Sequence, residues 1–221
     1  MNARIKVKVC GMTRPLDVRA AVELGVDAIG VILHANSPRK VDPELAARIR
    51  KEIPALVTMV GVYVDADKAL INHQIREIGL DLVQLHGQET DEFGRSLDAR
   101  FIKAIRARSV DQVERDIAAF PNAAAILLDP YVQGQHGGTG TVLDQALWTR
   151  AVMKSNMSEE SLSASGTRQR LILAGGLSPA NLSTAVREVK PWAVDLNSGV
   201  EKQPGVKDPE LIDAALQLLR R

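Results

Sequence analysis

Short apolar, β-branched runs recur along this chain at intervals that fit one strand, one helix and two short loops. The eight runs begin near Ile5, Ala28, Val57, Asp81, Phe101, Ala125, Leu171 and Ala193. Amphipathic stretches of helical period separate them; Gly25 and Gly79 stand where two of these should end, and Pro43, Pro179 and Pro209 where three should begin. This alternation predicts repeated βα units around a parallel sheet.

Eight such units in 221 residues fit a closed barrel, so we expect one α/β domain of the (β/α)8 TIM-barrel class over residues 1–221. An open doubly wound sheet is the alternative that the periodicity leaves, although residues 10–15 lack the glycine spacing of a dinucleotide-binding turn. The one long interval, between the sixth and seventh runs, holds a glycine-rich loop at 133–140 and a serine-rich polar run. We interpret this polar run, around 154–170, as a surface insertion and not as a domain boundary.

Composition narrows the class of function. The chain has 28 lysines and arginines against 27 aspartates and glutamates, which gives no electrostatic case for a nucleic-acid or membrane partner. No apolar run reaches the ~18 residues of a spanning helix, and no signal-peptide region is apparent, so we expect a cytoplasmic protein. The sole cysteine, Cys10, excludes an intrachain disulfide, and the four histidines show no metal-ligand spacing. Function is therefore expected in a small-molecule site without a metal.

The first strand carries polar side chains toward the end of the barrel where such folds hold their active sites. Period-two alternation directs Lys6, Lys8 and Cys10 inward. Cys10 ends the strand, and a nearby Lys8 ammonium would favour its thiolate, the form able to accept a proton. The alternatives are a buried apolar cysteine and a lysine that stabilises the barrel by pairing with a carboxylate.

Other strand ends carry further polar residues. Asp129 follows four apolar residues of the sixth strand, which suits a general acid, although a helix N-cap or a loop ion pair is the alternative. Arg39, in the loop after the second strand, suits bidentate capture of a carboxylate, or is a solvated surface arginine. Gln84 and His86 end the fourth strand, where they reach a ligand or fill the upper barrel layer.

Glycines follow both the seventh and the eighth strands. Gly175 and Gly176 precede the helix that begins at Pro179, and Ser198 and Gly199 follow the eighth strand. Loops at these two places commonly bind phosphate in barrels, because their glycines expose backbone N–H groups. A phosphate bound there would lie between Asp129 and Cys10, an acid and a base, which suggests isomerase or lyase chemistry.

At these residues the chain resembles the phosphoribosylanthranilate isomerase family, which are (β/α)8 enzymes of tryptophan biosynthesis. The resemblance covers nearly the whole chain in the right order. The matching segments are residues 8–13 (KVCGMT), 36–39 (NSPR), 83–87 (VQLHG), 127–129 (LLD), 137–140 (GGTG), 173–177 (LAGGL) and 198–201 (SGVE).

The resemblance implies an Amadori rearrangement of N-(5′-phosphoribosyl)anthranilate by general acid/base catalysis. It implies Asp129 as the acid and Cys10 as the base, with Arg39 on the anthranilate carboxylate and Asp195 on the ribose hydroxyls. Backbone amides around Gly175, Gly176, Ser198 and Gly199 would hold the phosphate. No cofactor or metal is implied, and the partner is a sugar-phosphate substrate bound by a monomer or homodimer.

Two departures from the family pattern stand beside that phosphate site. The family usually has serine at the position of Asn197 and valine at that of Leu196. Both changes keep the backbone donors, so we expect the phosphate site to be preserved.

Two rival functions come from other classes. A related barrel could epimerise a sugar phosphate, but such enzymes usually rely on metal-binding histidines and aspartates that this sequence does not present. A ligand-binding barrel without catalysis is the non-enzyme alternative, which the joint presence of Cys10, Asp129 and Arg39 disfavours.

Overall fold

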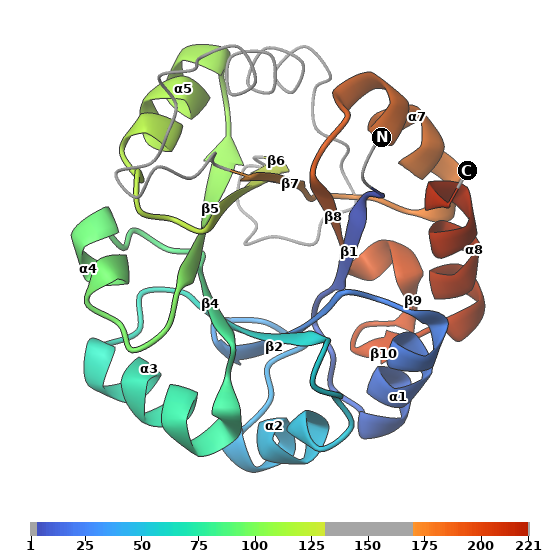
Figure 1. The fold of residues 1–221 in the computed structure, drawn as a ribbon, viewed down its shortest axis with the longest axis horizontal. Helices are drawn as coiled ribbons and strands as arrows, with labels where there is room; N and C mark the ends of the chain where they lie inside the picture. The colour runs from blue at the N-terminus through green and yellow to red at the C-terminus, as the bar shows by residue number, and fades with distance from the viewer. Residues whose placement is uncertain (1–3, 131–169, 221) are drawn as a thin grey trace.

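The computed structural model describes residues 4–130 and 170–220. Eight parallel strands close into a barrel in chain order, which confirms the predicted (β/α)8 class and excludes the open sheet (Figure 1). Each strand starts within one residue of its predicted position. The strands are β1 (Lys6–Val9), β2 (Ala28–His34), β3 (Thr58–Tyr63), β4 (Leu82–Leu85), β5 (Phe101–Ala107), β6 (Ala125–Pro130), β7 (Arg170–Leu173) and β8 (Ala193–Leu196). The predicted glycine-rich loop at 133–140 lies outside the described residues, and so does the polar run except for Arg170, which begins β7.

Helices surround the barrel on its outer face (Figure 1). They are α1 (Pro15–Leu24), α2 (Pro43–Arg50), α3 (Lys68–Gln74), the π-helical η1 (Ile75–Gly79), α4 (Asp91–Arg95), α5 (Val110–Ala118), α7 (Pro179–Val189) and α8 (Pro209–Leu219). Among the described residues, no helix combines the length and the apolar character needed to cross a bilayer.

Local sequence signals explain where these helices begin and end. The three prolines at the predicted starts are the first residues of α2, α7 and α8, where a missing N–H costs no hydrogen bond. Asp42 accepts a 2.7 Å hydrogen bond from the Leu45 amide at the start of α2. Gly25 caps α1 with a φ of 94°, as predicted. Gly79 also has a positive φ, 77°, but it ends the π-helical turn η1 and not an α-helix.

The core has two layers because successive strand side chains point to opposite faces. The larger layer lies between barrel and helices and includes Ile126 and Leu128 of β6. The alternate residues, Ala125 and Leu127, belong to a separate cluster that fills the barrel interior. The upper interior has a different composition: it holds Cys10 with Ile32 and Val62.

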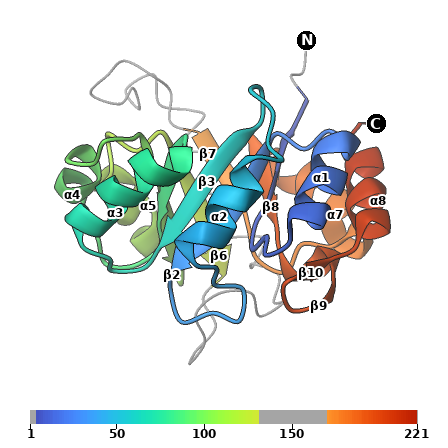
Figure 2. The same ribbon diagram turned by 90° about the horizontal axis from the view of Figure 1, so that it is seen from below.

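A short antiparallel hairpin follows β8 and was not predicted. Ser198–Val200 form a 3-10 turn, η2, and the chain then continues as β9 (Glu201–Gln203) and β10 (Val206–Lys207). Gly205 makes the turn between these strands with a φ of 81°. In Figure 2 the hairpin lies at the same end of the barrel as the loop between β2 and α2, opposite the N-terminus.

Lys6 does not join the polar residues of the upper barrel. It stands at the first residue of β1, where its ammonium lies 3.2 Å from Asp27 and 42% of its side chain is exposed. Lys8, two residues later, is buried inside the barrel. The alternation therefore gave the correct direction for Lys8 and Cys10, while Lys6 is too near the strand's start to reach the site.

Candidate functional site

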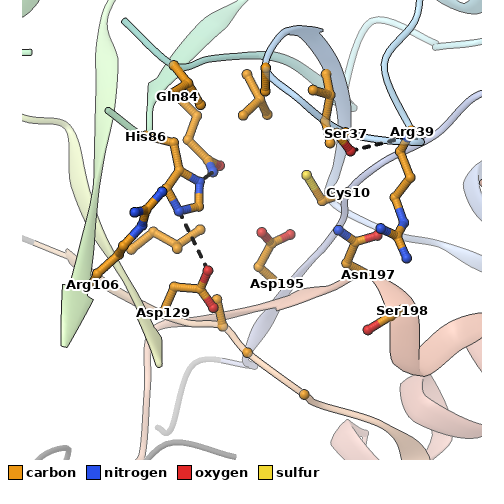
Figure 3. A pocket seen from close by; sticks show the side chains of 18 of the residues that line it. Cys10, Ser37, Arg39, Gln84, His86, Arg106, Asp129, Asp195, Asn197 and Ser198 are labelled. Carbon is orange, nitrogen blue, oxygen red and sulfur yellow. Dashed lines mark hydrogen bonds and ion pairs between the residues drawn. The ribbon is translucent and has the colours of Figure 1, made fainter. Parts of the chain in front are cut away.

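One pocket lies at the carboxyl ends of the strands, and all eight strands or the loops that follow them contribute to its lining. It encloses about 830 Å³, including space open to solvent at its mouth. Every site residue singled out from the sequence lines this pocket: Cys10, Arg39, Gln84, His86, Asp129, Gly175, Gly176, Asp195, Ser198 and Gly199. Figure 3 shows Cys10, Gln84, His86, Asp129 and Asp195 around one space, with Arg39 and Ser198 at its edge.

Cys10 follows β1 and is buried at the upper end of the barrel. Its amide donates a 2.8 Å hydrogen bond to the carbonyl of Leu196, and only 5% of the residue is exposed. Gly30 on β2 leaves the room that the thiol occupies, because a Cβ there would stand 2.8 Å from Cys10 Sγ and 3.1 Å from Lys8 Cε. Burial raises the pKa of the Cys10 thiol, and the Lys8 ammonium opposes this only in part. The net direction is therefore opposite to the one expected from Lys8 alone.

Lys8 and Asp195 form a buried ion pair beneath the pocket. Lys8 Nζ donates a 2.8 Å hydrogen bond to Asp195 Oδ2, and both side chains are less than one-tenth exposed. Burial alone would lower the pKa of Lys8, but the Asp195 carboxylate and Cys10 together outweigh it and raise that pKa. Lys8 therefore does pair with a carboxylate, which was one of the alternatives left open by the sequence. In Figure 3 the Asp195 carboxylate lies between Cys10 and Asp129.

Gln84, His86 and Asp129 form a polar row on the other side of the pocket (Figure 3). Gln84 Nε2 lies 3.3 Å from His86 Nδ1, and His86 Nε2 lies 3.5 Å from Asp129 Oδ2. The second contact has ion-pair length but makes no hydrogen bond. His86 can therefore hold either a ligand or the Asp129 carboxylate.

Buried polar atoms without a partner concentrate in this pocket. Across the described residues they are Gln84 Oε1, His86 Nε2 and Asp195 Oδ1. Buried polar groups in folded proteins are rarely left unpaired, and each such group calls for an explanation. Three of them lining one cavity give it hydrogen-bonding atoms that are available to a polar ligand.

Arg39 points toward the hairpin end of the pocket. Its Nε donates to both carboxylate oxygens of Glu201, at 2.9 and 3.1 Å, and its Nη2 donates to Glu201 Oε2 at 2.7 Å. Lys207 binds the same carboxylate at 2.7 Å. Arg39 is thus not a solvated surface arginine. Neither Glu201 nor Lys207 was predicted from the sequence as a functional residue.

The glycine loops after β7 and β8 meet at the pocket wall. Gly175 and Gly176 have φ values of 88° and 60°, a conformation that L side chains rarely adopt. A Cβ on Gly199 would stand 2.0 Å from the carbonyl oxygen of Leu177, so only glycine permits this approach of the two loops. Ser178 and Asn181 cap α7, whose N-terminus begins just beyond Leu177. Backbone amides and a helix N-terminus at one wall suit an anion.

Arg106 and Asn197 also line the pocket. Arg106 shares the inward face of β5 with Ala104, so reading the end of the fifth strand by alternation would have found it. Asn197 was predicted to matter only as a position where this chain departs from the family pattern. Within residues 4–130 and 170–220, no group of three or more potential ligand side chains is arranged to hold a metal ion.

Comparison with known proteins gives one consistent result. The family model described as N-(5′-phosphoribosyl)anthranilate (PRA) isomerase matches residues 7–218. A protein from Pseudomonas fluorescens (strain SBW25), named N-(5′-phosphoribosyl)anthranilate isomerase, is 40% identical over 216 residues, which cover 98% of this chain and 96% of the relative.

Solved structures agree with the sequence matches. The phosphoribosyl anthranilate isomerase of Thermotoga maritima superposes with a TM-score of 0.84 at 33% identity, covering 98% of both chains. A structure of phosphoribosyl anthranilate isomerase in complex with reduced 1-(o-carboxyphenylamino)-1-deoxyribulose 5-phosphate superposes with a TM-score of 0.80 at 32% identity, again over 98% of both chains.

Proposed function

This chain belongs to the N-(5′-phosphoribosyl)anthranilate isomerase family, and on that premise we propose that it catalyses the Amadori rearrangement of N-(5′-phosphoribosyl)anthranilate in tryptophan biosynthesis. The product is 1-(2-carboxyphenylamino)-1-deoxyribulose 5-phosphate. The observation that carries the proposal is the single pocket that gathers Cys10, Asp129, Arg39 and both glycine loops. It offers an acid, a base, a carboxylate binder and an anion site around one space.

Ring opening is the first step, with Asp129 as the general acid. Its carboxyl group gives a proton to the furanose ring oxygen, the C1′–O bond breaks, and the nitrogen lone pair forms an iminium at C1′. The wall formed by Asp129 and Leu127 excludes part of the solvent, since both are buried. A partly desolvated acid transfers its proton efficiently to a bound oxygen.

Proton removal from C2′ is the second step, with Cys10 as the general base. The thiolate takes the C2′ proton, and the C–H electron pair forms the C1′–C2′ double bond of an enolamine as the iminium is neutralised. Tautomerisation then moves a proton to C1′ and leaves a ketone at C2′. Hydrogen moves from C2′ to C1′ and no electrons leave the substrate, so the step needs no redox cofactor.

The two ends of the substrate are held at opposite parts of the pocket. Arg39 takes the anthranilate carboxylate through the edge of its guanidinium that Glu201 does not occupy. Amides of Gly175, Gly176, Ser198 and Gly199 hold the phosphate at the α7 end. Asp195 Oδ1, which has no hydrogen-bond partner within the protein, accepts from a ribose hydroxyl, and Gln84 and His86 supply further hydrogen bonds.

We further propose a cytoplasmic location, where the one cysteine stays reduced, and a monomeric or homodimeric state. Sedimentation of the purified chain checks the state. A mass other than one or two copies would contradict it.

A fluorescence assay with freshly prepared N-(5′-phosphoribosyl)anthranilate tests the activity. The purified chain should consume the substrate, and Asp129→Asn should lose most of that activity while keeping its affinity for the product analogue. Binding of the analogue without turnover by the wild-type chain would favour a silent ligand-binding barrel. Turnover that requires an added divalent metal would favour the chemistry of the metal-dependent epimerases.

A further inference from the structure

Three buried charged residues stand together beside the pocket, and the mechanism above uses only one of them. Glu201 lies between Arg39 and Lys207, with hydrogen bonds of 2.7 Å to Arg39 Nη2 and 2.7 Å to Lys207 Nζ. The side chains of Arg39, Glu201 and Lys207 are 11%, 4% and 0% exposed. Burying three charged side chains carries a desolvation cost even when they are paired. The arrangement is therefore weak evidence for a stabilising role, and its position beside the pocket favours a role there.

The contact with Glu201 fixes the orientation of the Arg39 guanidinium. Glu201 takes both the Nε and the Nη2 hydrogens, which is the two-point geometry in which an arginine loses its rotational freedom. Gly11 leaves the room that the stem of the same side chain occupies, since a Cβ there would stand 2.7 Å from Arg39 Cδ. With its Nε and Nη2 edge held by Glu201, Arg39 keeps its Nη1 side for another partner.

Lys207 links this pair to the loop that follows β8. Its ammonium donates to the carbonyl oxygen and the side-chain oxygen of Asn197, at 3.2 and 3.0 Å. Its backbone amide donates a 3.0 Å hydrogen bond to Asp17 Oδ2 on α1. The hairpin is thus anchored on both sides, and Glu201 occupies a fixed position relative to the strand ends.

The charges favour an ionised Glu201 and a positively charged Arg39. Burial would raise the pKa of Glu201, but hydrogen bonds from Arg39 and Lys207 outweigh it and lower that pKa. Burial lowers the pKa of Lys207, whereas Glu201 raises that of Arg39, so the firm positive charge of the group is the Arg39 guanidinium beside the pocket. A substrate carboxylate would neutralise it.

We propose that Glu201 is the positioning residue of Arg39, holding one edge of the guanidinium so that the other edge faces the substrate carboxylate. Glu201 touches no reacting atom and acts through Arg39 alone. The inference rests on the proposed function, because it takes Arg39 as the binder of the anthranilate carboxylate.

A double-mutant cycle measured by ligand binding tests this role. The probes are reduced 1-(o-carboxyphenylamino)-1-deoxyribulose 5-phosphate and ribose 5-phosphate, which lacks the aromatic carboxylate. The proteins are the wild type, Glu201→Gln, Arg39→Ala and the double variant. Glu201→Gln should lower the affinity for the reduced analogue roughly tenfold, which is the scale of a charge-assisted hydrogen bond. The reason is that the amide –NH2 repels the guanidinium and turns it away. Ribose 5-phosphate should bind within about twofold of wild type.

The double variant gives the decisive comparison. If Glu201 acts only through Arg39, the double variant should bind the reduced analogue no more weakly than Arg39→Ala does. Additive losses, or equal losses for both probes, would overturn the proposal. Glu201→Asp should recover part of the affinity, because it restores the charge at a greater distance.

Two further variants separate orientation from folding. Glu201→Gln leaves Lys207 without its carboxylate, so Glu201→Gln with Lys207→Met removes that unpaired cation and should still lose affinity for the reduced analogue. Glu52→Gln breaks another two-point pair with arginine, Arg19–Glu52, on the exposed surface and should change nothing.

Failure of this proposal is distinguishable from failure of the proposed function. The wild type could bind the reduced analogue without turning over N-(5′-phosphoribosyl)anthranilate. That result would contradict the proposed function, while the binding cycle would still test the positioning role of Glu201. A wild type that does not bind the analogue overturns both.

Discussion

Lys8 and Asp195 stand directly opposite each other where β1 pairs with β8, and their side chains meet inside the barrel at 2.8 Å. The pair places a positive charge next to Cys10 and leaves Asp195 Oδ1 facing the pocket. One buried ion pair therefore influences both the proposed base and the proposed contact with the ribose.

Titration of Cys10 should show a thiol with a pKa above its ordinary value. Burial favours the neutral form, so the thiolate should be scarce at neutral pH and increase as the pH rises into the alkaline range. Absorbance near 240 nm reports thiolate, and subtracting the Cys10→Ser spectrum at each pH isolates this one cysteine. Lys8→Met should move the transition to still higher pH, since it removes the ammonium that opposes burial. A Cys10 titration below the pH range of a free thiol would contradict the raised pKa. The absence of a shift in Lys8→Met would contradict the influence of the Lys8 ammonium on Cys10.

Replacing the thiol by a hydroxyl should nearly abolish turnover. Cys10→Ser keeps the size of the side chain, but its hydroxyl is too weakly acidic to provide a base, and loss of a general base costs ~10²–10⁴-fold. Affinity for the reduced product analogue should stay close to that of the wild type. Near-normal turnover by Cys10→Ser would remove Cys10 from the mechanism.

Arg39 variants should separate the two ends of the substrate. Arg39→Ala leaves Glu201 paired with Lys207, so the protein should fold, but it should bind anthranilate-bearing ligands weakly. Arg39→Lys should recover only part of the affinity, because a point charge cannot bind Glu201 and a substrate carboxylate with two edges. Inhibition by ribose 5-phosphate is the control. If it weakens equally, Arg39 holds the phosphate or the loop instead.

Phosphate should bind to backbone amides. Crystals soaked in sulfate should show an anion within hydrogen-bond reach of the amides at Gly175, Gly176, Ser198 or Gly199. Gly176→Ala should reduce affinity for inorganic phosphate, although its positive φ means that the substitution also strains the fold by roughly 1–2 kcal/mol. Gly79→Ala carries the same kind of strain on η1, where a Cβ would make only an ordinary 3.6 Å contact with Arg50 Nε, and should lower Tm similarly without affecting phosphate. An anion bound only to lysine or arginine side chains elsewhere would contradict this site.

Most of the barrel was predictable because its signals are local. Alternation within a strand, a proline at a helix start and a glycine after its end depend on a few neighbouring residues, and the strand starts followed from them. The strand ends and the loops after them then located nine of the ten pocket residues, because the carboxyl ends of a parallel barrel share one face, whereas Asp195 followed only from the family resemblance.

Among the unpredicted features, the pairing of Glu201 with Arg39 depends on a contact between distant segments, whereas the hairpin had a local signal. Glu201 meets Arg39 across 162 residues, and no spacing within either segment indicates that pairing. The Pro204-Gly205 dipeptide was a local turn signal for the hairpin that carries Glu201 and Lys207. The sequence also could not predict whether the pKa of Cys10 is raised or lowered. The direction depends on how deeply the thiol is buried as well as on which charge stands near it.

Closure of the barrel between β1 and β8 also sets when the protein becomes competent during its synthesis. Lys8 and Asp195 are separated by 187 positions, so β1 leaves the ribosome long before its counter-ion is translated. A nascent chain that ends before Ala193 lacks β8, which is one of the two strands beside β1, and with it the partner of Lys8 and the loop after β8. On the proposed role of that loop in binding phosphate, ligand binding by staged ribosome-stalled chains should begin only once β8 and the loop have emerged.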